Sequence, residues 1–310
     1  MAEQNAGTKE LLDAVQDDPT AIDLELAEEL LEAEGASGRA TALQAISVIA
    51  TEEPDRVLEY TDRVVELLDD DVLSVRSTAA LALTSLARNR PDAVVPAVPS
   101  LVDILGAEPP LFRFRAAGAL ASLTADHPDA FVEHTDHLFE LLLDGPTFDD
   151  DPRAIATSEE LSPEEKQRTL STLAGRSSEW KRARTRSNAT REVVANVLVE
   201  VARVAPEEIE SRLDRVLEML SDDDAAVRGA GVEMVRHVAE DDPDAAEDAI
   251  DPLLALLDDV EFVRARAIRA LGYAEAGPAI EPLREIASTD SNDDIANLAA
   301  DTADWLGENS

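Results

Sequence analysis

The residues best suited to chemistry lie in a basic segment at 176–191. Its sequence, RSSEWKRARTRSNATR, contains five arginines and one lysine against the single carboxylate of Glu179, whereas the whole chain has a formal net charge of −40. Guanidinium and ammonium groups bind phosphates and carboxylates, and an indole such as that of Trp180 can stack on a planar group. The segment therefore predicts an anion-binding surface for an acidic protein or a nucleic acid. Its expected contact residues are Arg176, Trp180, Lys181, Arg182, Arg184 and Arg191.

A second interpretation of the basic segment is internal. Acidic turns occur along the chain, and Asp149–Asp151 lies shortly before the segment. The arginines could pair with these carboxylates and hold the preceding loop against the rest of the protein. The sequence leaves both interpretations open.

Other residues give little support for catalysis or metal binding. His134 and His137 are three apart, with Glu133 and Glu140 nearby, a spacing that could hold a metal but equally suits a solvated helix face. The chain has no cysteine, which excludes disulfides and thiol catalysis. It also lacks phosphate-binding glycine loops and the Gly-x-Ser-x-Gly motif. We predict no catalytic residue, no metal and no cofactor.

The composition indicates a folded, strongly acidic helical protein. Hydrophobic residues make up 45% of the chain and aromatic residues only 3%, so the core must consist mainly of Ala, Leu, Val and Ile. The 67 acidic residues, with only three lysines, resemble the surface of proteins from extremely halophilic archaea. No apolar run approaches the roughly 20 residues of a membrane-spanning helix. We expect a cytoplasmic protein with no membrane contact, in which most carboxylates serve solvation.

Prolines recur with a period near 37 residues. Their spacings are 35, 37, 37, 78, 37 and 35. Proline is favoured at the first position of a helix, so each marks the start of a unit. The spacing of 78 indicates one period plus an insertion. The prolines are Pro19, Pro54, Pro91, Pro128, Pro206, Pro243 and Pro278.

A second marker gives the same count of seven. Six units contain an arginine, and the seventh an alanine, followed three positions later by Ala or Gly; a small side chain there lets a neighbouring helix approach closely. The arginines are Arg39, Arg76, Arg115, Arg186, Arg228 and Arg264, with Ala296 in the last copy. The small residues are Ala42, Ala79, Gly118, Ala189, Gly231, Ala267 and Ala299.

The repeat resembles the HEAT family. The clearest copies are 67–87, 219–235 and 253–274, in which Leu-Leu or Met-Leu and an acidic turn precede Val-Arg and a helix with small residues. The resemblance implies an all-α, right-handed α-solenoid of about seven helical hairpins. It also implies that the arginine of one repeat pairs with a turn aspartate of its neighbour. The arginines assigned by resemblance to this structural ladder are Arg76, Arg115, Arg186, Arg228 and Arg264.

The markers predict one solenoid over the whole chain. Residues 8–17 are expected to form an additional N-terminal helix, and Trp305 with Leu306 to close the core at the other end. The insertion at 144–183 lies within the fourth repeat, and a capping box at Ser162 predicts a helix over 163–174. The repeats are expected near 19–50, 54–87, 91–125, 128–202 (interrupted), 206–239, 243–274 and 278–306.

The family resemblance implies a non-enzymatic scaffold that holds another protein on its concave face, formed by the second helices. The charge of the basic insertion segment predicts a second docking surface, used in place of the concave face or together with it. The alternative is a nucleic-acid-binding HEAT protein that uses residues 176–191. A HEAT-like DNA glycosylase or lyase-type enzyme has weaker support, because the chain contains only two tryptophans and two tyrosines.

Overall fold

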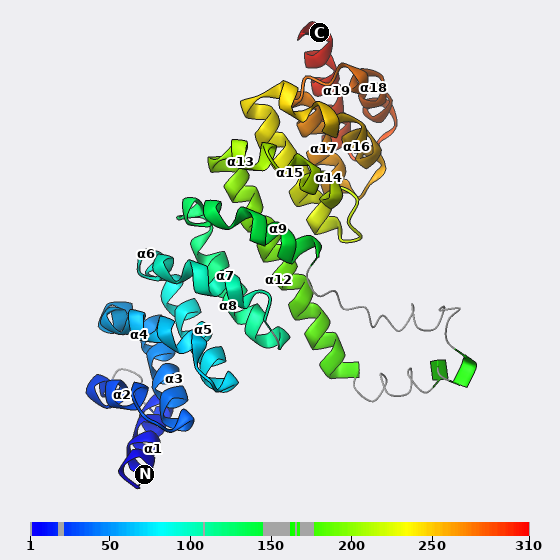
Figure 1. Cartoon of the computed structure of the whole chain (residues 1–310). Helices are drawn as coiled ribbons and strands as arrows, with labels where there is room; N and C mark the ends of the chain where they lie inside the picture. Colours follow the sequence, from blue (N-terminus) through cyan, green and yellow to red (C-terminus); the bar gives the residue numbers. More distant parts are fainter. Residues whose placement is uncertain are drawn as a thin grey trace. The chain divides into compact units, whose positions relative to one another are not determined.

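The computed structural model describes residues 2–17, 22–107, 109–144, 162–164, 166–167 and 177–309. Within these ranges the regular structure is helical throughout and no strand occurs (Figure 1). The contacts divide the chain into two compact units. Unit 1 comprises residues 1–127 and 144–193, and unit 2 comprises residues 128–143 and 194–310.

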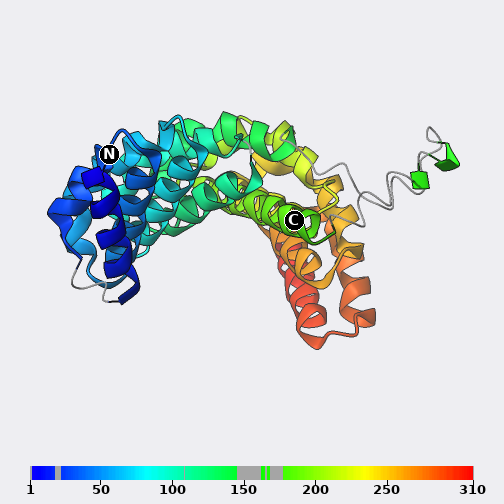
Figure 2. The same cartoon turned by 90° about the horizontal axis from the view of Figure 1, so that it is seen from below.

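Unit 1 begins with an N-terminal helix and three helical hairpins. In each hairpin a segment that includes short 3-10 turns or a short α-helix precedes a longer second helix. The second helices α3, α5 and α8 pack side by side (Figures 1 and 2). The elements are α1 (Ala2–Asp17), α2 (Leu24–Leu31), α3 (Ala36–Glu52), η2 (Pro54–Tyr60), α4 (Thr61–Glu66), η3 (Leu67–Asp69), α5 (Leu73–Ala87), α6 (Pro91–Val94), η4 (Val95–Ala97), α7 (Val98–Ile104) and α8 (Pro110–Leu123). The first half of α12 (Ser177–Val204) completes the unit.

Unit 2 repeats the same hairpin. Its second helices are the end of α12, α15, α17 and α19, and consecutive members α15, α17 and α19 pack on one another. The other elements are η5 (Pro128–His134), α9 (Thr135–Leu143), α13 (Pro206–Glu210), α14 (Leu213–Met219), α15 (Ala225–Asp241), η6 (Pro243–Ala249), α16 (Ile250–Ala255), η7 (Leu256–Asp258), α17 (Glu261–Tyr273), η8 (Gly277–Ala279), α18 (Ile280–Thr289) and α19 (Asp293–Asn309).

The recurring prolines lie where the first helical segments begin. Pro54 and Pro243 each open a 3-10 segment, and Pro91 and Pro206 each open an α-helix. A proline fits there because the first helical N–H groups have no partner within the helix. Pro19 lies outside the described residues.

The small residue after each arginine lies where second helices are crowded. Ala42, Ala79, Ala267 and Ala299 are fully buried. At Gly231 an added Cβ would lie 3.1 Å from Leu220 Cδ2 and 3.2 Å from the Met219 Cβ. A side chain there would need the packed layer to shift, so the close approach of α14 and α15 depends on glycine.

The structure corrects two expectations drawn from the sequence. The N-terminal helix begins at Ala2, well before the predicted start at residue 8. Trp305 does not close the core, because it is 43% exposed whereas Leu306 is buried. Most of the predicted insertion at 144–183 lies outside the described residues, and the single continuous solenoid stays a prediction. None of the described helices is long and apolar enough to cross a membrane.

Candidate functional site

Arginines of three second helices each bind an aspartate of the following hairpin. Arg39 donates to both carboxylate oxygens of Asp70 at 2.6 and 3.0 Å, and Arg228 does the same to Asp259 at 2.6 and 2.7 Å. In both pairs the aspartate lies 31 positions after the arginine. Each arginine also donates to carbonyls at the end of its own first helix, for example Asp222 at 2.7 Å. One guanidinium therefore caps its own hairpin and binds the following one.

Other copies vary this contact according to the residue that the next turn supplies. Arg264 forms an ion pair with Asp290 at 3.0 Å. Arg76 has Ala107 at the corresponding position, and its guanidinium instead lies 5.7 Å from the centroid of the Phe112 ring. We use the name arginine–aspartate ladder for the pairs Arg39–Asp70, Arg228–Asp259 and Arg264–Asp290. Arg39 carries the repeat marker but was not among the predicted ladder arginines, although Asp70 lies at the same 31-residue spacing as Asp259 from Arg228.

The ladder perturbs the ionisation of its carboxylates. Hydrogen bonds from Arg39 hold the pKa of Asp70 below its usual value, and those from Arg228 do the same for Asp259. In each case a backbone N–H, of Val72 or Val260, also donates to the carboxylate and lowers its pKa further. These aspartates stay ionised and hold structure, so they are poor candidates for acid–base chemistry.

Arg115 departs from the predicted ladder, whereas the assignment of Arg186 to the ladder stays a prediction. Arg115 donates back to the preceding hairpin, to the Ser77 carbonyl at 2.7 Å and the Ser77 hydroxyl at 2.8 Å. Burial lowers the pKa of Arg115, and the nearby positive charge of Arg186 lowers it further. Arg186 of α12 is therefore near enough to Arg115 of α8 for the two positive charges to repel each other.

The basic segment is only partly described. Arg182 and Arg184 are exposed on α12, and Arg191 is half-buried on the same helix. Trp180 and Lys181 belong to α12, but their side chains lie outside the description, as does Arg176 altogether. The anion-binding surface and the pinning role both stay predictions.

Unit 1 has an exposed surface of unusual composition. Together α3, α5 and α8 contain one carboxylate, Glu52, at the last residue of α3. Exposed and half-exposed positions at helical spacing form one uncharged stripe on each helix, which we name the neutral face. Its members are Ser37, Ala40, Gln44, Val48 and Thr51 on α3, Ser74, Thr78, Leu81 and Ser85 on α5, and Leu111, Phe114, Gly118, Ala121 and Ser122 on α8.

The neutral face combines small polar groups with two exposed apolar side chains. Leu81 and Phe114 are 36% and 41% exposed, respectively. A hydrogen bond of 2.9 Å between the Ser47 and Ser85 hydroxyls joins α3 to α5, and Thr84 donates to the Arg115 carbonyl at 3.0 Å. The three helices thus present a fixed platform without charge.

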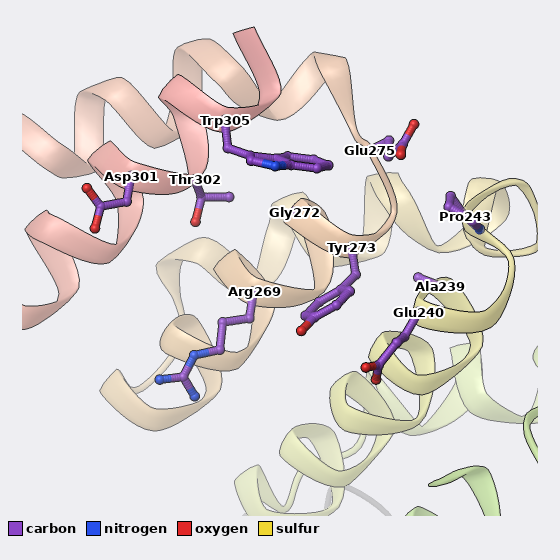
Figure 3. A pocket seen from close by; sticks show the side chains of 10 residues that line it. All are labelled: Ala239, Glu240, Pro243, Arg269, Gly272, Tyr273, Glu275, Asp301, Thr302 and Trp305. Atoms are coloured by element: carbon purple, nitrogen blue, oxygen red, sulfur yellow. The ribbon is translucent and has the colours of Figure 1, made fainter. Parts of the chain in front are cut away.

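Unit 2 contains a cavity of about 530 Å³ between α15, α17 and α19. Figure 3 shows the rings of Tyr273 and Trp305 on either side of Gly272, with carboxylates at the margin. Tyr273 is 44% exposed, so one of the two tyrosines and one of the two tryptophans face the same opening. An adjoining hollow of about 400 Å³ shares Arg269 and Asp301 with this cavity. The cavity was not predicted from the sequence, although Tyr273 and Trp305 occupy the same position in consecutive repeats.

The histidine pair has a simple local explanation. His137 lies 3.4 Å from Glu140, one turn away on α9. Among the described residues, no group of three or more potential ligands converges on a metal position.

Comparison with solved structures identifies the fold. The archaeal HEAT-like repeats protein from Thermococcus onnurineus NA1 matches with a TM-score of 0.58 and 15% identity, over 93% of this chain and 98% of that one. The chain has a HEAT-like helical-repeat fold. Two engineered proteins match with TM-scores of 0.55 and 0.54, at 18% and 21% identity, over 80% and 81% of this chain and 96% and 98% of theirs. No family model and no curated protein matches the chain. At identities of 15–21% the likeness shows the fold alone. A function must therefore be inferred from the surfaces of this chain.

Proposed function

We propose that this HEAT-like chain is a non-enzymatic scaffold that binds another protein through the neutral face of unit 1. The observation that carries the proposal is the absence of charge from that face in a chain with 67 acidic residues. A surface selected only for solvation would share the acid of the rest of the chain. Depletion of charge, with exposed apolar side chains such as Leu81 and Phe114, is typical of the central part of a protein interface.

The basic segment extends this proposal. Arg182 and Arg184 are exposed on α12, and Arg186 of the same helix is near enough to Arg115 of α8 to lower its pKa. A partner with an apolar centre and acidic flanks would complement both surfaces. Nucleic acid is the alternative partner, since exposed arginines also bind phosphates.

The test uses paired substitutions and partner capture at fixed salt. We expect Leu81→Glu with Phe114→Glu to reduce capture of the partner at least tenfold, because two carboxylates would be placed in an uncharged contact. The control is Leu58→Glu, since Leu58 is equally exposed, at 36%, but lies on the first-helix segment η2. Equal capture by the Leu81/Phe114 and Leu58 variants would contradict the proposal.

A second arm tests the basic segment. Replacing Lys181, Arg182 and Arg184 with glutamate should weaken capture of an acidic partner while leaving the helical circular dichroism unchanged. Capture that stays at the parent level would remove the basic segment from the binding surface. Binding of an RNA or DNA duplex that falls steeply with salt and is lost in the same variant would favour nucleic acid over protein.

A further inference from the structure

The aromatic cavity of unit 2 lies where one repeat has a glycine, Gly272, at the position that Arg236 occupies in the repeat before it. Tyr273 lies nine positions after Arg264, and Trp305 lies nine positions after Ala296, so the two rings are equivalent in consecutive repeats. Arg236 lies eight positions after Arg228, and the equivalent residue eight positions after Arg264 is Gly272. The pairs Arg236–Tyr273 and Gly272–Trp305 can therefore be compared directly.

In the first pair the chain stacks its own cation on its own ring. The Arg236 guanidinium carbon lies 5.7 Å from the centroid of Tyr273, within the range of a cation–π interaction. Glu233 and Glu240 hold the guanidinium from the same helix, at 2.7 and 3.0 Å. An aromatic face with flanking carboxylates is thus already an arginine site in this fold.

In the second pair Gly272 stands where the first pair has Arg236, and the cavity lies beside the Trp305 ring. Gly272 has no side chain to offer, and a Cβ there would lie 3.1 Å from Thr302 Cγ2. Trp305 is 43% exposed, and among the described residues no cation lies over its ring. Tryptophan gives the strongest cation–π interaction of the three aromatic side chains. Of the two rings, Trp305 is therefore better suited to bind a cation than Tyr273, which already has Arg236 over it.

The margin of the cavity has the matching charge. Glu240, Glu275 and Asp301 contribute carboxylates, and Arg269 is the one basic residue among the lining residues (Figure 3). Glu275 has a φ of 49°, the left-handed conformation that ordinarily favours glycine. A non-glycine residue in this conformation costs about 1 kcal/mol, and here it places a carboxylate at the opening.

The cavity continues into a hollow that can hold more than one side chain. The adjoining hollow is lined by Phe262, Ile295 and Leu298 together with the carboxylates of Glu261 and Asp294. Together the two cavities form a track along α17 and α19 that a small cation alone would leave largely empty.

We propose that this track binds an extended basic peptide segment of a partner, with an arginine side chain inserted beside Trp305 in the position that Arg236 occupies beside Tyr273. The carboxylates pair with the guanidinium, and neighbouring peptide residues occupy the hollow at Ile295. This site belongs to unit 2 and uses no residue of the neutral face, so it stands or falls separately from the function proposed above.

The test uses the full chain with Trp180→Phe, which leaves Trp305 as the only tryptophan. A short glycine–serine–alanine peptide with one central arginine is titrated while the fluorescence of Trp305 is recorded. We expect a saturable change, and binding about tenfold weaker when citrulline, which has the same shape without charge, replaces the arginine. Equal affinities for the two peptides would overturn the proposal.

Substitutions locate the binding and identify the ligand class. The affinity of each variant for a fluorescently labelled arginine peptide is measured. We expect Trp305→Leu to bind the peptide at least tenfold more weakly, whereas Phe114→Leu on the neutral face should bind it as tightly as the parent. Gly272→Arg should also abolish binding, because the chain would then supply its own cation beside Trp305. If Gly272→Arg does not fold, Trp305→Leu alone decides the test. Unchanged affinity in Trp305→Leu, or free arginine amide binding as tightly as the peptide, would refute a peptide site.

Discussion

The arginine–aspartate ladder predicts a specific loss of stability when Asp259 is replaced with alanine. Asp259 accepts two charge-assisted hydrogen bonds from Arg228 and a third from the Val260 N–H at 2.6 Å. The side chains of Arg228 and Asp259 are only 17% and 11% exposed, which limits replacement by water. Hydrogen bonds to charged groups contribute about 1.5–3 kcal/mol each. Arg228 keeps its carbonyl acceptors, so we expect a net loss of about 2–3 kcal/mol.

The assay is urea unfolding followed by helical circular dichroism at fixed salt and pH 7. Asp258→Ala is the matched control, because Asp258 is an exposed neighbour whose removal relieves charge repulsion equally. The free energy of unfolding of Asp259→Ala should lie at least 1.5 kcal/mol below that of Asp258→Ala, about half of the expected loss. A difference under about 0.5 kcal/mol would show that the ladder does not hold the repeats together.

The loss of unfolding free energy in Asp259→Ala should depend on pH with a known sign. Arg228 lowers the pKa of Asp259 in the folded state, so the folded protein binds this proton only at lower pH than the unfolded chain. The contribution of Asp259 is therefore complete above its unfolded pKa of about 3.9 and is lost as the pH falls through the folded value. The difference between the parent and Asp259→Ala should be constant from pH 5 to 8 and should shrink below about pH 4. A difference that grows on acidification would refute the assignment.

Two further predictions concern the backbone and the packing. Glu275→Gly should stabilise the protein by about 1 kcal/mol, because glycine adopts a positive φ without strain, whereas Glu285→Gly within α18 should destabilise it by a similar amount. Both are measured by urea unfolding, and a loss of stability in Glu275→Gly would contradict the strain. Gly231→Ala should be about 1–2 kcal/mol less stable than Gly118→Ala, since both gain helix propensity but the Cβ approaches its neighbours to 3.1 Å at Gly231 and only 3.4 Å at Gly118. Equal unfolding free energies for these two variants would show that the packed layer shifts without cost.

Local signals in the sequence were enough to predict the fold. Proline at a helix start and a small residue at a helix crossing act through the backbone and through short contacts, so their spacing alone predicts helical hairpins. Solved HEAT-like structures agree with this fold. The start of α1 was misplaced because Ala2 and its polar neighbours give no capping signal, and the helix extends to residue 2.

The surfaces were harder to predict because they depend on which side chains converge. Trp305 was assigned to the core by its apolar character, but the residue is 43% exposed and lines a cavity together with Gly272. That relationship crosses from one repeat to the next and is visible only when the repeats are aligned by Arg264 and Ala296. The neutral face was likewise hidden, since absence of charge on three separate helices has no local motif.

The neutral face also makes the three hairpins of unit 1 electrically one-sided. Among the described residues of these hairpins, exposed carboxylates lie on the first-helix segments and at helix ends, and none belongs to the neutral face, so the hairpins carry a charge moment. Those carboxylates include Glu28, Glu59, Asp62, Asp92 and Asp103. The field of such a moment reaches about 10 Å in 0.1 M salt but only about 3 Å at 1 M. In dilute salt the unit would orient an approaching acidic molecule before contact, whereas at molar salt selection would depend on shape and on the apolar side chains of Leu81 and Phe114.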